Sequence, residues 1–182
     1  MSKVVHPYAL RLPLIRDWKS RWFKTGSEYR NTLIADTKIR AYLEKKLRTA
    51  SVADIEIERG PKTTRIVIHT ARPGVIIGRS GESATVLRTD LAKFMKREQL
   101  ELSADLKIDI VEVTNPDANA TIIAQSIAEM LEKRMTFRRV LKQTTEKVMA
   151  ARGVKGVKVS LSGRLGGADM ARREELKLGG IP

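Results

Sequence analysis

The chain has 182 residues, 42% of them hydrophobic, which suffices for one large or two small domains with real cores. The sequence contains no cysteine, no apolar run of membrane-spanning length and no signal-peptide pattern, which excludes disulfides and predicts a cytoplasmic protein without membrane contact. Its formal net charge of +14 indicates a polyanionic partner.

The positive charge is concentrated at the two ends of the chain. Residues 1–50 carry a net charge of +8 and residues 133–182 carry +9, whereas residues 101–132 carry −6. Two separate contacts with a polyanion would produce this segregation, and a requirement for solubility alone would produce a milder version of it.

Residues 1–26 show no helical or strand period and mix cations with Trp18 and Trp22. This composition predicts an extended basic arm that becomes ordered on a partner. A mobile terminus, or packing of the two tryptophans on the protein's own domain, are the alternatives.

A helix from Ser27 to Leu33 is expected next, followed by a second one capped by Asp36. The second helix places Ile39, Leu43 and Leu47 on one face. Its other face is rich in lysine and arginine, which fits either a solvated surface or a nucleic-acid contact.

Two alternating segments, 54–58 and 65–69, predict strands joined as a hairpin by the turn residues 59–62. A short helix over 75–77, a helix over 84–97 and a third strand over 106–110 follow.

The segment Gly78-Arg79-Ser80-Gly81 lies between the two predicted helices. Two glycines allow a sharp turn and a close approach of backbones, and the N-terminus of the following helix offers free N–H groups. A loop of this kind clamps the RNA backbone in KH modules. The element order predicts an α+β fold, in which residues 27–114 form a KH domain of the second type with helices on one face of a three-stranded sheet. A plain turn without a ligand is the alternative.

Asn115-Pro116-Asp117 marks a boundary, after which residues 115–182 are expected to form a second α/β domain. A helix follows from Ala118, with a break near Thr136. The next helix carries Arg138, Arg139 and Lys142 within an arc of about 100°. A strand over 157–161, a glycine-rich loop over 162–167 and a weakly apolar tail complete the chain.

The sequence indicates no enzyme, cofactor or metal site. His6 and His69 lie far apart without cysteine or carboxylate neighbours. Asp54, Glu56 and Glu58 alternate along one strand, which favours solvation or salt pairing over catalysis.

Four motifs run from end to end of the chain. They are Pro7, Arg11-Leu12 and Trp18-x-Ser20-x-Trp22-Phe23; Ile68-His69-Thr70-Ala71-Arg72-Pro73-Gly74 leading to Ile77-Gly78-x-x-Gly81; Phe137-Arg138-Arg139-x-x-Lys142; and Val159-x-Leu161-Ser162-Gly163-Arg164-Leu165-Gly166-Gly167-Ala168. With these motifs the chain resembles the bacterial small-subunit ribosomal protein S-three family.

The resemblance implies a structural protein of the head of the small ribosomal subunit that binds 16S rRNA. It implies that Arg138, Arg139 and Lys142 line the mRNA entry channel and assist mRNA unwinding. The implied neighbours are ribosomal proteins S-ten and S-fourteen, with S-four and S-five at the mRNA entry. Together with the basic arm, the resemblance predicts rRNA contacts by the KH loop and by a further set of residues: Lys3, Arg11, Arg16, Trp18, Lys19, Arg21, Trp22, Arg72 and Arg164.

Two departures from the family pattern are visible. Ala9 and Pro13 stand where glycine is expected, and the sequence ends at Pro182 where relatives continue with strands beside residues 157–161. A free-standing KH regulator or RNA chaperone is the alternative function, and a nuclease using Asp54, Glu56 and Glu58 is a second one.

Overall fold

The structure is a computed structural model that describes residues 5–6, 8–61, 63–100 and 105–180. The chain forms two compact units, Met1–Glu112 and Val113–Pro182, and each has its own hydrophobic core. Among the helices described, none is long and apolar enough to cross a membrane.

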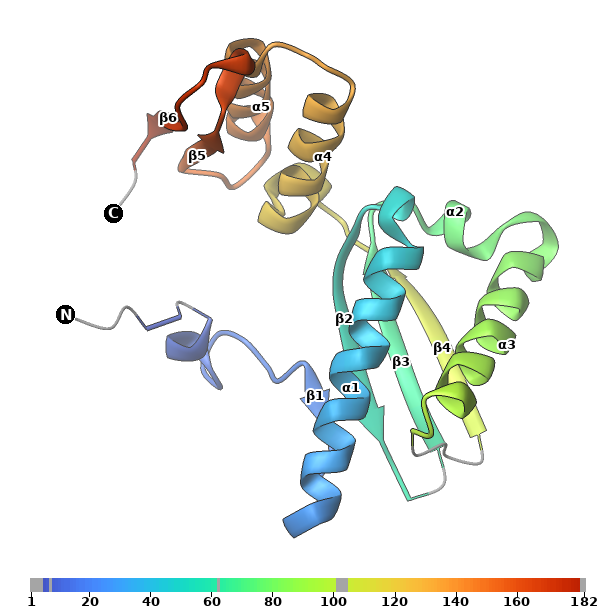
Figure 1. Ribbon diagram of the computed structural model, residues 1–182. Coiled ribbons are helices and arrows are strands. Elements are labelled where there is room, and N and C mark those ends of the chain that lie inside the picture. The colour runs from blue at the N-terminus through green and yellow to red at the C-terminus, as the bar shows by residue number, and fades with distance from the viewer. Residues whose placement is uncertain (1–4, 7, 62, 101–104, 181–182) are drawn as a thin grey trace. The chain divides into compact units, whose positions relative to one another are not determined.

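The first unit is built on a sheet with the strand order β1-β2-β3-β4 (Figure 1). β2 (Val52–Arg59) and β3 (Thr63–Thr70) pair antiparallel, as the predicted hairpin requires. β4 (Asp105–Glu112) lies parallel to β3, with Ile66 opposite Ile108. A parallel pair needs a crossover connection, and the helices between β3 and β4 supply it.

The helices between these strands are α2 (Pro73–Ile77) and α3 (Glu82–Arg97). Leu87, Leu91 and Met95 of α3 are buried and recur at helical spacing, which explains why this segment is a helix. The predicted short helix, glycine turn and long helix are therefore confirmed.

Residues 26–46 form one continuous helix, α1 (Gly26–Lys46), so the prediction of two helices was wrong. No glycine or proline between Leu33 and Asp36 interrupts the helix. Asp36 is not a cap but a fully buried residue inside α1, on the same face as Ile39 and Leu43.

The core of the first unit lies between the helices and one face of the sheet. Ile55 and Ile57 of β2 and Ile66 and Ile68 of β3 are at most 3% exposed, as their alternation predicts. Burying each such side chain contributes about 1.5–3 kcal/mol. The opposite face of the sheet carries Glu56, Glu58, Arg65 and His69 of the same strands, together with the buried Val67.

The sheet of the first unit has four strands, one more than the three that the sequence predicted. β1 (Ser20–Arg21) pairs in parallel with β2, with Ser20 opposite Ile57 and Arg21 opposite Glu58. The segment predicted to be an arm ordered by a partner is thus fixed at its C-terminal end on the chain's own sheet. The rest of the described part of residues 5–19 includes a short 3-10 turn, η1 (Ala9–Arg11).

The second unit contains α4 (Ala120–Glu132), α5 (Phe137–Ala150) and a two-stranded antiparallel sheet of β5 (Gly156–Gly163) and β6 (Arg172–Gly179). Asn119 caps α4, since its Oδ1 accepts from the backbone N–H groups of Thr121 and Ile122. α4 therefore begins two residues later than predicted. The break at Thr136 is confirmed.

The weakly apolar tail is a strand in the structure. β6 pairs with β5 from Gly163 opposite Arg172 to Gly156 opposite Gly179. Leu176 and Leu178 alternate with charged residues, as in a strand with one apolar face. The high charge of the segment makes this alternation difficult to recognise in the sequence. The predicted strand over 157–161 consequently finds one neighbour within this sequence.

Candidate nucleic-acid interface

The glycine loop has a backbone that only glycine adopts readily. Gly78 has φ 70° and ψ −172°, and Gly81 has φ 80° and ψ 5°. A Cβ on Gly78 would lie 2.1 Å from Oγ of Ser83, so the first turn of α3 approaches the loop too closely for any side chain there.

Between the glycines, Arg79 and Ser80 are exposed. The loop thus offers an exposed guanidinium and an exposed hydroxyl next to the N-terminal end of α3, which are groups that suit a phosphodiester backbone. Arg72 lies just before α2 and is also exposed.

The basic face of α5 is the second candidate contact. Val140, Leu141 and Val148 of α5 are buried, while Arg138, Arg139 and Lys142 are exposed, as the helical spacing predicts. Among the residues described, neither Arg138 nor Arg139 has a carboxylate partner, and Lys142 lies 4.0 Å from Glu146. Cations without a strong internal partner are available to an external anion.

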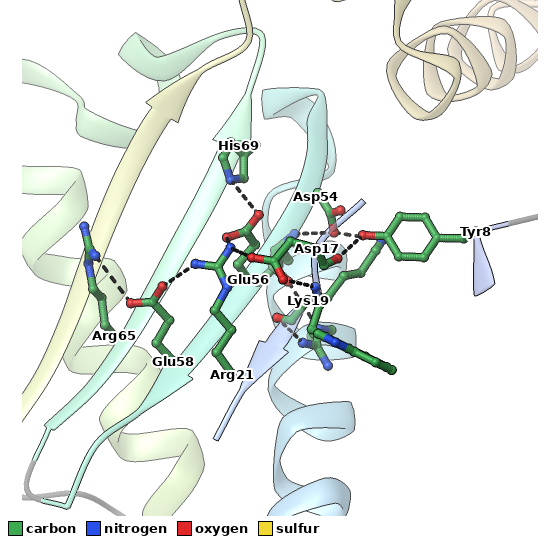
Figure 2. A network of polar contacts seen from close by, with 12 residues as sticks. Tyr8, Asp17, Lys19, Arg21, Asp54, Glu56, Glu58, Arg65 and His69 are labelled. Carbon is green, nitrogen blue, oxygen red and sulfur yellow. Dashed lines mark hydrogen bonds and ion pairs between the residues drawn. The ribbon is translucent and has the colours of Figure 1, made fainter. Parts of the chain in front are cut away.

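The cations of the N-terminal segment are placed differently, as Figure 2 shows. Lys19 lies 2.9 Å from Asp54, and Arg21 lies 2.7 Å from Glu58 and 3.3 Å from Glu56. The hydrogen bond to Glu58 raises the pKa of the Arg21 guanidinium. Both side chains therefore fix the segment to β2.

The same network continues across the polar face of the sheet (Figure 2). Arg65 of β3 bridges Glu58 of β2 and Asp109 of β4, and the Asp109 hydrogen bond raises the pKa of Arg65. His69 Nε2 lies 3.4 Å from Glu56 Oε1, without the alignment of a hydrogen bond. The alternating carboxylates thus take part in salt pairing, one of the two interpretations that the sequence favoured.

The two tryptophans have different surroundings. Trp22 is half-buried, donates from Nε1 to Asp36 Oδ2 at 2.8 Å, and its ring lies 5.4 Å from that of Tyr29. Trp18 is 59% exposed. Trp22 therefore packs on the protein's own domain, as one of the alternatives predicted, whereas Trp18 remains mostly exposed.

The remaining candidates are scattered. Arg11 and Arg16 are exposed in the N-terminal segment, and Lys3 lies outside the described residues. Arg164 is exposed in the second unit and donates from Nε to the carbonyl of Ala168 at 2.9 Å. Their predicted contacts with rRNA stay predictions.

Sequence reasoning missed the buried ion pair between Asp36 and Arg59. Asp36 Oδ1 accepts from Nε and Nη2 of Arg59 at 2.9 and 2.7 Å, and the two side chains are 0% and 6% exposed. A signal was present, because Asp36 falls on the apolar stripe of Ile39 and Leu43, where a carboxylate needs a buried partner.

Comparisons with known proteins agree with this architecture. The model of the KH domain matches residues 38–118, and the model of the ribosomal protein S3 C-terminal domain matches residues 127–182. The chain is 42% identical over 182 residues to the small ribosomal subunit protein uS3 of Clostridium acetobutylicum, covering 100% of this chain and 79% of the relative.

Two further relatives carry the same name. The uS3 protein of Ectopseudomonas mendocina is 43% identical over 182 residues, which cover 100% of this chain and 76% of the relative. That of Exiguobacterium sibiricum is 42% identical over 182 residues, with coverage of 100% and 80%. With such identity along its whole length, this chain belongs to the small ribosomal subunit protein uS3 family.

Proposed function

We propose that the protein is a structural constituent of the small ribosomal subunit, where it binds 16S rRNA in the bacterial cytoplasm. Membership of the uS3 family and the net charge of +14 support this function. Proteins of this family are ribosomal proteins and not enzymes, in line with the absence of a catalytic pattern from the sequence. Phosphate contacts dominate affinity for RNA and carry little sequence information, so many dispersed cations suit a folded rRNA.

The KH loop and the basic face of α5 have different roles in this proposal. Gly78, Arg79, Ser80 and Gly81 contact the rRNA backbone, with the residues of the N-terminal segment adding further contacts. Arg138, Arg139 and Lys142 line the mRNA entry channel and assist unwinding of the message. Ribosomal proteins S-ten, S-fourteen, S-four and S-five are the proposed neighbours.

One observation carries the assignment of α5 to a moving strand. The cations of the KH sheet are paired with carboxylates, whereas Arg138 and Arg139 lack such partners in the described part of the chain. Solvated guanidinium and ammonium groups make screened, exchangeable contacts, and a sliding strand needs contacts of this kind.

The test is a variant with Arg138→Ala, Arg139→Ala and Lys142→Ala. The matched control is a variant in which Lys158, Arg173 and Lys177 are replaced by Ala. These substitutions remove the same charge from the same unit, but the three side chains lie around Glu175. We expect both variants to enter small subunits normally, and only the α5 variant to slow translation through stable mRNA hairpins.

Sedimentation of cell extract distinguishes the possible failures. Small subunits that lack the α5 variant would show that this helix is an rRNA anchor rather than a channel wall. A wild-type protein found wholly in the free pool at moderate salt would contradict the ribosomal function itself.

A further inference from the structure

The ring of Phe137, the first residue of α5, has two guanidinium groups beside it. Cζ of Arg138 lies 5.7 Å from the ring centroid, and Cζ of Arg172 lies 5.4 Å from it. Both distances are within the range of a cation–π interaction. Arg172 opens β6 and is distant from Phe137 in sequence, so no helical or strand spacing brings the two residues together.

The turn between β5 and β6 completes this surface. A Cβ on Gly166 would lie 3.7 Å from Cε1 of Phe137, so the turn Leu165–Gly167 is against the same ring. Gly163, at the end of β5, is paired with Arg172 in the register of the sheet. The start of α5, the turn and the start of β6 therefore meet around Phe137.

The charges around Phe137 are only weakly compensated. Arg172 Nε lies 3.7 Å from Glu174 Oε1, beyond hydrogen-bond distance, and the two side chains are 47% and 39% exposed. An exposed pair of this kind contributes little and exchanges readily for another anion. Two cations on one ring repel each other, and a phosphate near both would relieve that repulsion.

We propose that Arg172 contacts the same single-stranded RNA as Arg138 and Arg139, with the ring of Phe137 holding its guanidinium in place. The inference rests on the proposed function of α5. A guanidinium beside an aromatic ring keeps its N–H donors and its own planar face for a ligand. Phosphate oxygens accept from such donors, and nucleobases stack on such planes.

Binding of a fluorescent, unstructured oligouridylate to the full chain, followed by anisotropy across a salt series, tests the proposal. The variant is Arg172→Ala, and the matched control is Arg173→Ala, which removes the same charge from the next residue of β6. Neighbouring residues of a strand point to opposite faces, and Arg173 donates from Nε to Ser160 Oγ at 2.8 Å.

We expect Arg172→Ala to weaken binding about two- to fivefold at low salt. The loss of one phosphate contact should lower the slope of log K against log salt by about 0.7. Arg173→Ala should leave this slope unchanged. Arg172→Lys keeps the charge and should therefore show the same slope as the wild type. If Arg172→Ala and Arg173→Ala weaken binding equally, the loss of affinity reflects net charge alone and the proposal is wrong.

The role of the ring has its own test. Phe137→Leu keeps an apolar side chain but removes the π face, and we expect it to weaken binding by about as much as Arg172→Ala. The double variant should bind no worse than either single variant, because both changes remove the same contact. Fully additive losses would show that Phe137 does not hold Arg172.

The variant of Arg138, Arg139 and Lys142 separates this inference from the proposed function. If that variant loses affinity for the oligouridylate while Arg172→Ala keeps it, the role of Arg172 is wrong and the function of α5 stands. If the α5 variant binds normally, the proposed function of α5 fails whatever Arg172 does.

Discussion

At the scale of single residues, Asp36 is a fully buried carboxylate of the first unit that accepts four hydrogen bonds. Its Oδ1 accepts twice from Arg59, and its Oδ2 accepts from Trp22 Nε1 at 2.8 Å and Ser20 Oγ at 3.1 Å. A buried carboxylate is tolerated only when its oxygens are satisfied in this way. Asp36 thereby joins α1, the end of β2 and the β1 segment.

Asp36→Ala should destabilise the protein by about 3–5 kcal/mol, because it leaves the buried guanidinium of Arg59 without a counter-charge. The measurement is urea unfolding of the purified chain. Asp109→Ala is the control, since Asp109 also pairs with an arginine but is 41% exposed. The control should lose at most about 1 kcal/mol. Similar losses in the two variants would contradict the role assigned to burial.

The two loop glycines differ in a way that mutation can measure. Gly78→Ala meets both a backbone region that only glycine occupies and the side chain of Ser83, so we expect a loss of at least about 3 kcal/mol. Gly81→Ala meets no atom within 4 Å and should lose about 1–2 kcal/mol, the cost of a left-handed backbone. Thermal unfolding of both variants measures the difference, and a Gly81→Ala loss equal to that of Gly78→Ala would refute the contribution of Ser83.

At the scale of elements, α1 and α3 are tied together by ion pairs outside the core. Lys46 of α1 binds Asp90 of α3, and Lys38 of α1 lies 2.8 Å from Glu98, the residue after α3. The hydrogen bond from Lys46 lowers the pKa of Asp90, and that from Lys38 lowers the pKa of Glu98. Burial lowers the pKa of Lys46, but the contacts with Asp90 and Tyr42 outweigh it and raise the pKa overall.

These shifts predict a loss of stability in acid. The pKa of Asp90 is lower in the folded than in the unfolded chain, so its contribution is present above the ordinary value of 3.8 and is lost as the pH falls below it. Asp90→Asn should therefore reduce stability at neutral pH and flatten its decline between pH 5 and about pH 2.

The readout is the urea midpoint of wild type and variant across this pH range. Asp169→Asn serves as the control, because the Asp169 side chain is fully exposed in the second unit. If the stability of Asp90→Asn declines in acid as steeply as that of the wild type, the ion pair between α1 and α3 is not the source of that decline.

At the scale of the whole molecule, the two units have separate cores. One contains Ile39, Leu43, Ile57, Ile66 and Leu91, and the other contains Ile123, Ile127, Val140 and Val148. A core that is complete within a unit is the condition for independent folding.

A fragment of residues 1–112 should consequently fold alone. We expect its amide NMR signals to superimpose on those of the same residues in the full chain, apart from residues near position 112. Far-UV circular dichroism should also show a cooperative thermal transition for the fragment. Collapsed, poorly dispersed signals would mean that the first unit depends on the second for its structure.

Sequence periodicity alone determined much of this protein. Ile55 and Ile57 in β2, Leu87 and Leu91 in α3, and the exposed arc of Arg138, Arg139 and Lys142 all follow from the spacing of two in strands and 3.6 in helices. These features depend on residues that are neighbours along the chain, so a short window of sequence contains the information. The KH element order could be predicted for the same reason.

Only the tertiary structure decided which distant segments meet. β1 pairs with β2, Asp36 binds Arg59 and Trp22, and Arg172 lies over Phe137, although no local period relates these residues. Each contact depends on where the fold brings two distant segments together. The buried charge of Asp36 needs a partner there, and the partly buried ring of Phe137 offers one to Arg172. The sequence supplied the cations, and the fold determined which of them, such as Arg21, pair with carboxylates and which, such as Arg138, are exposed to solvent.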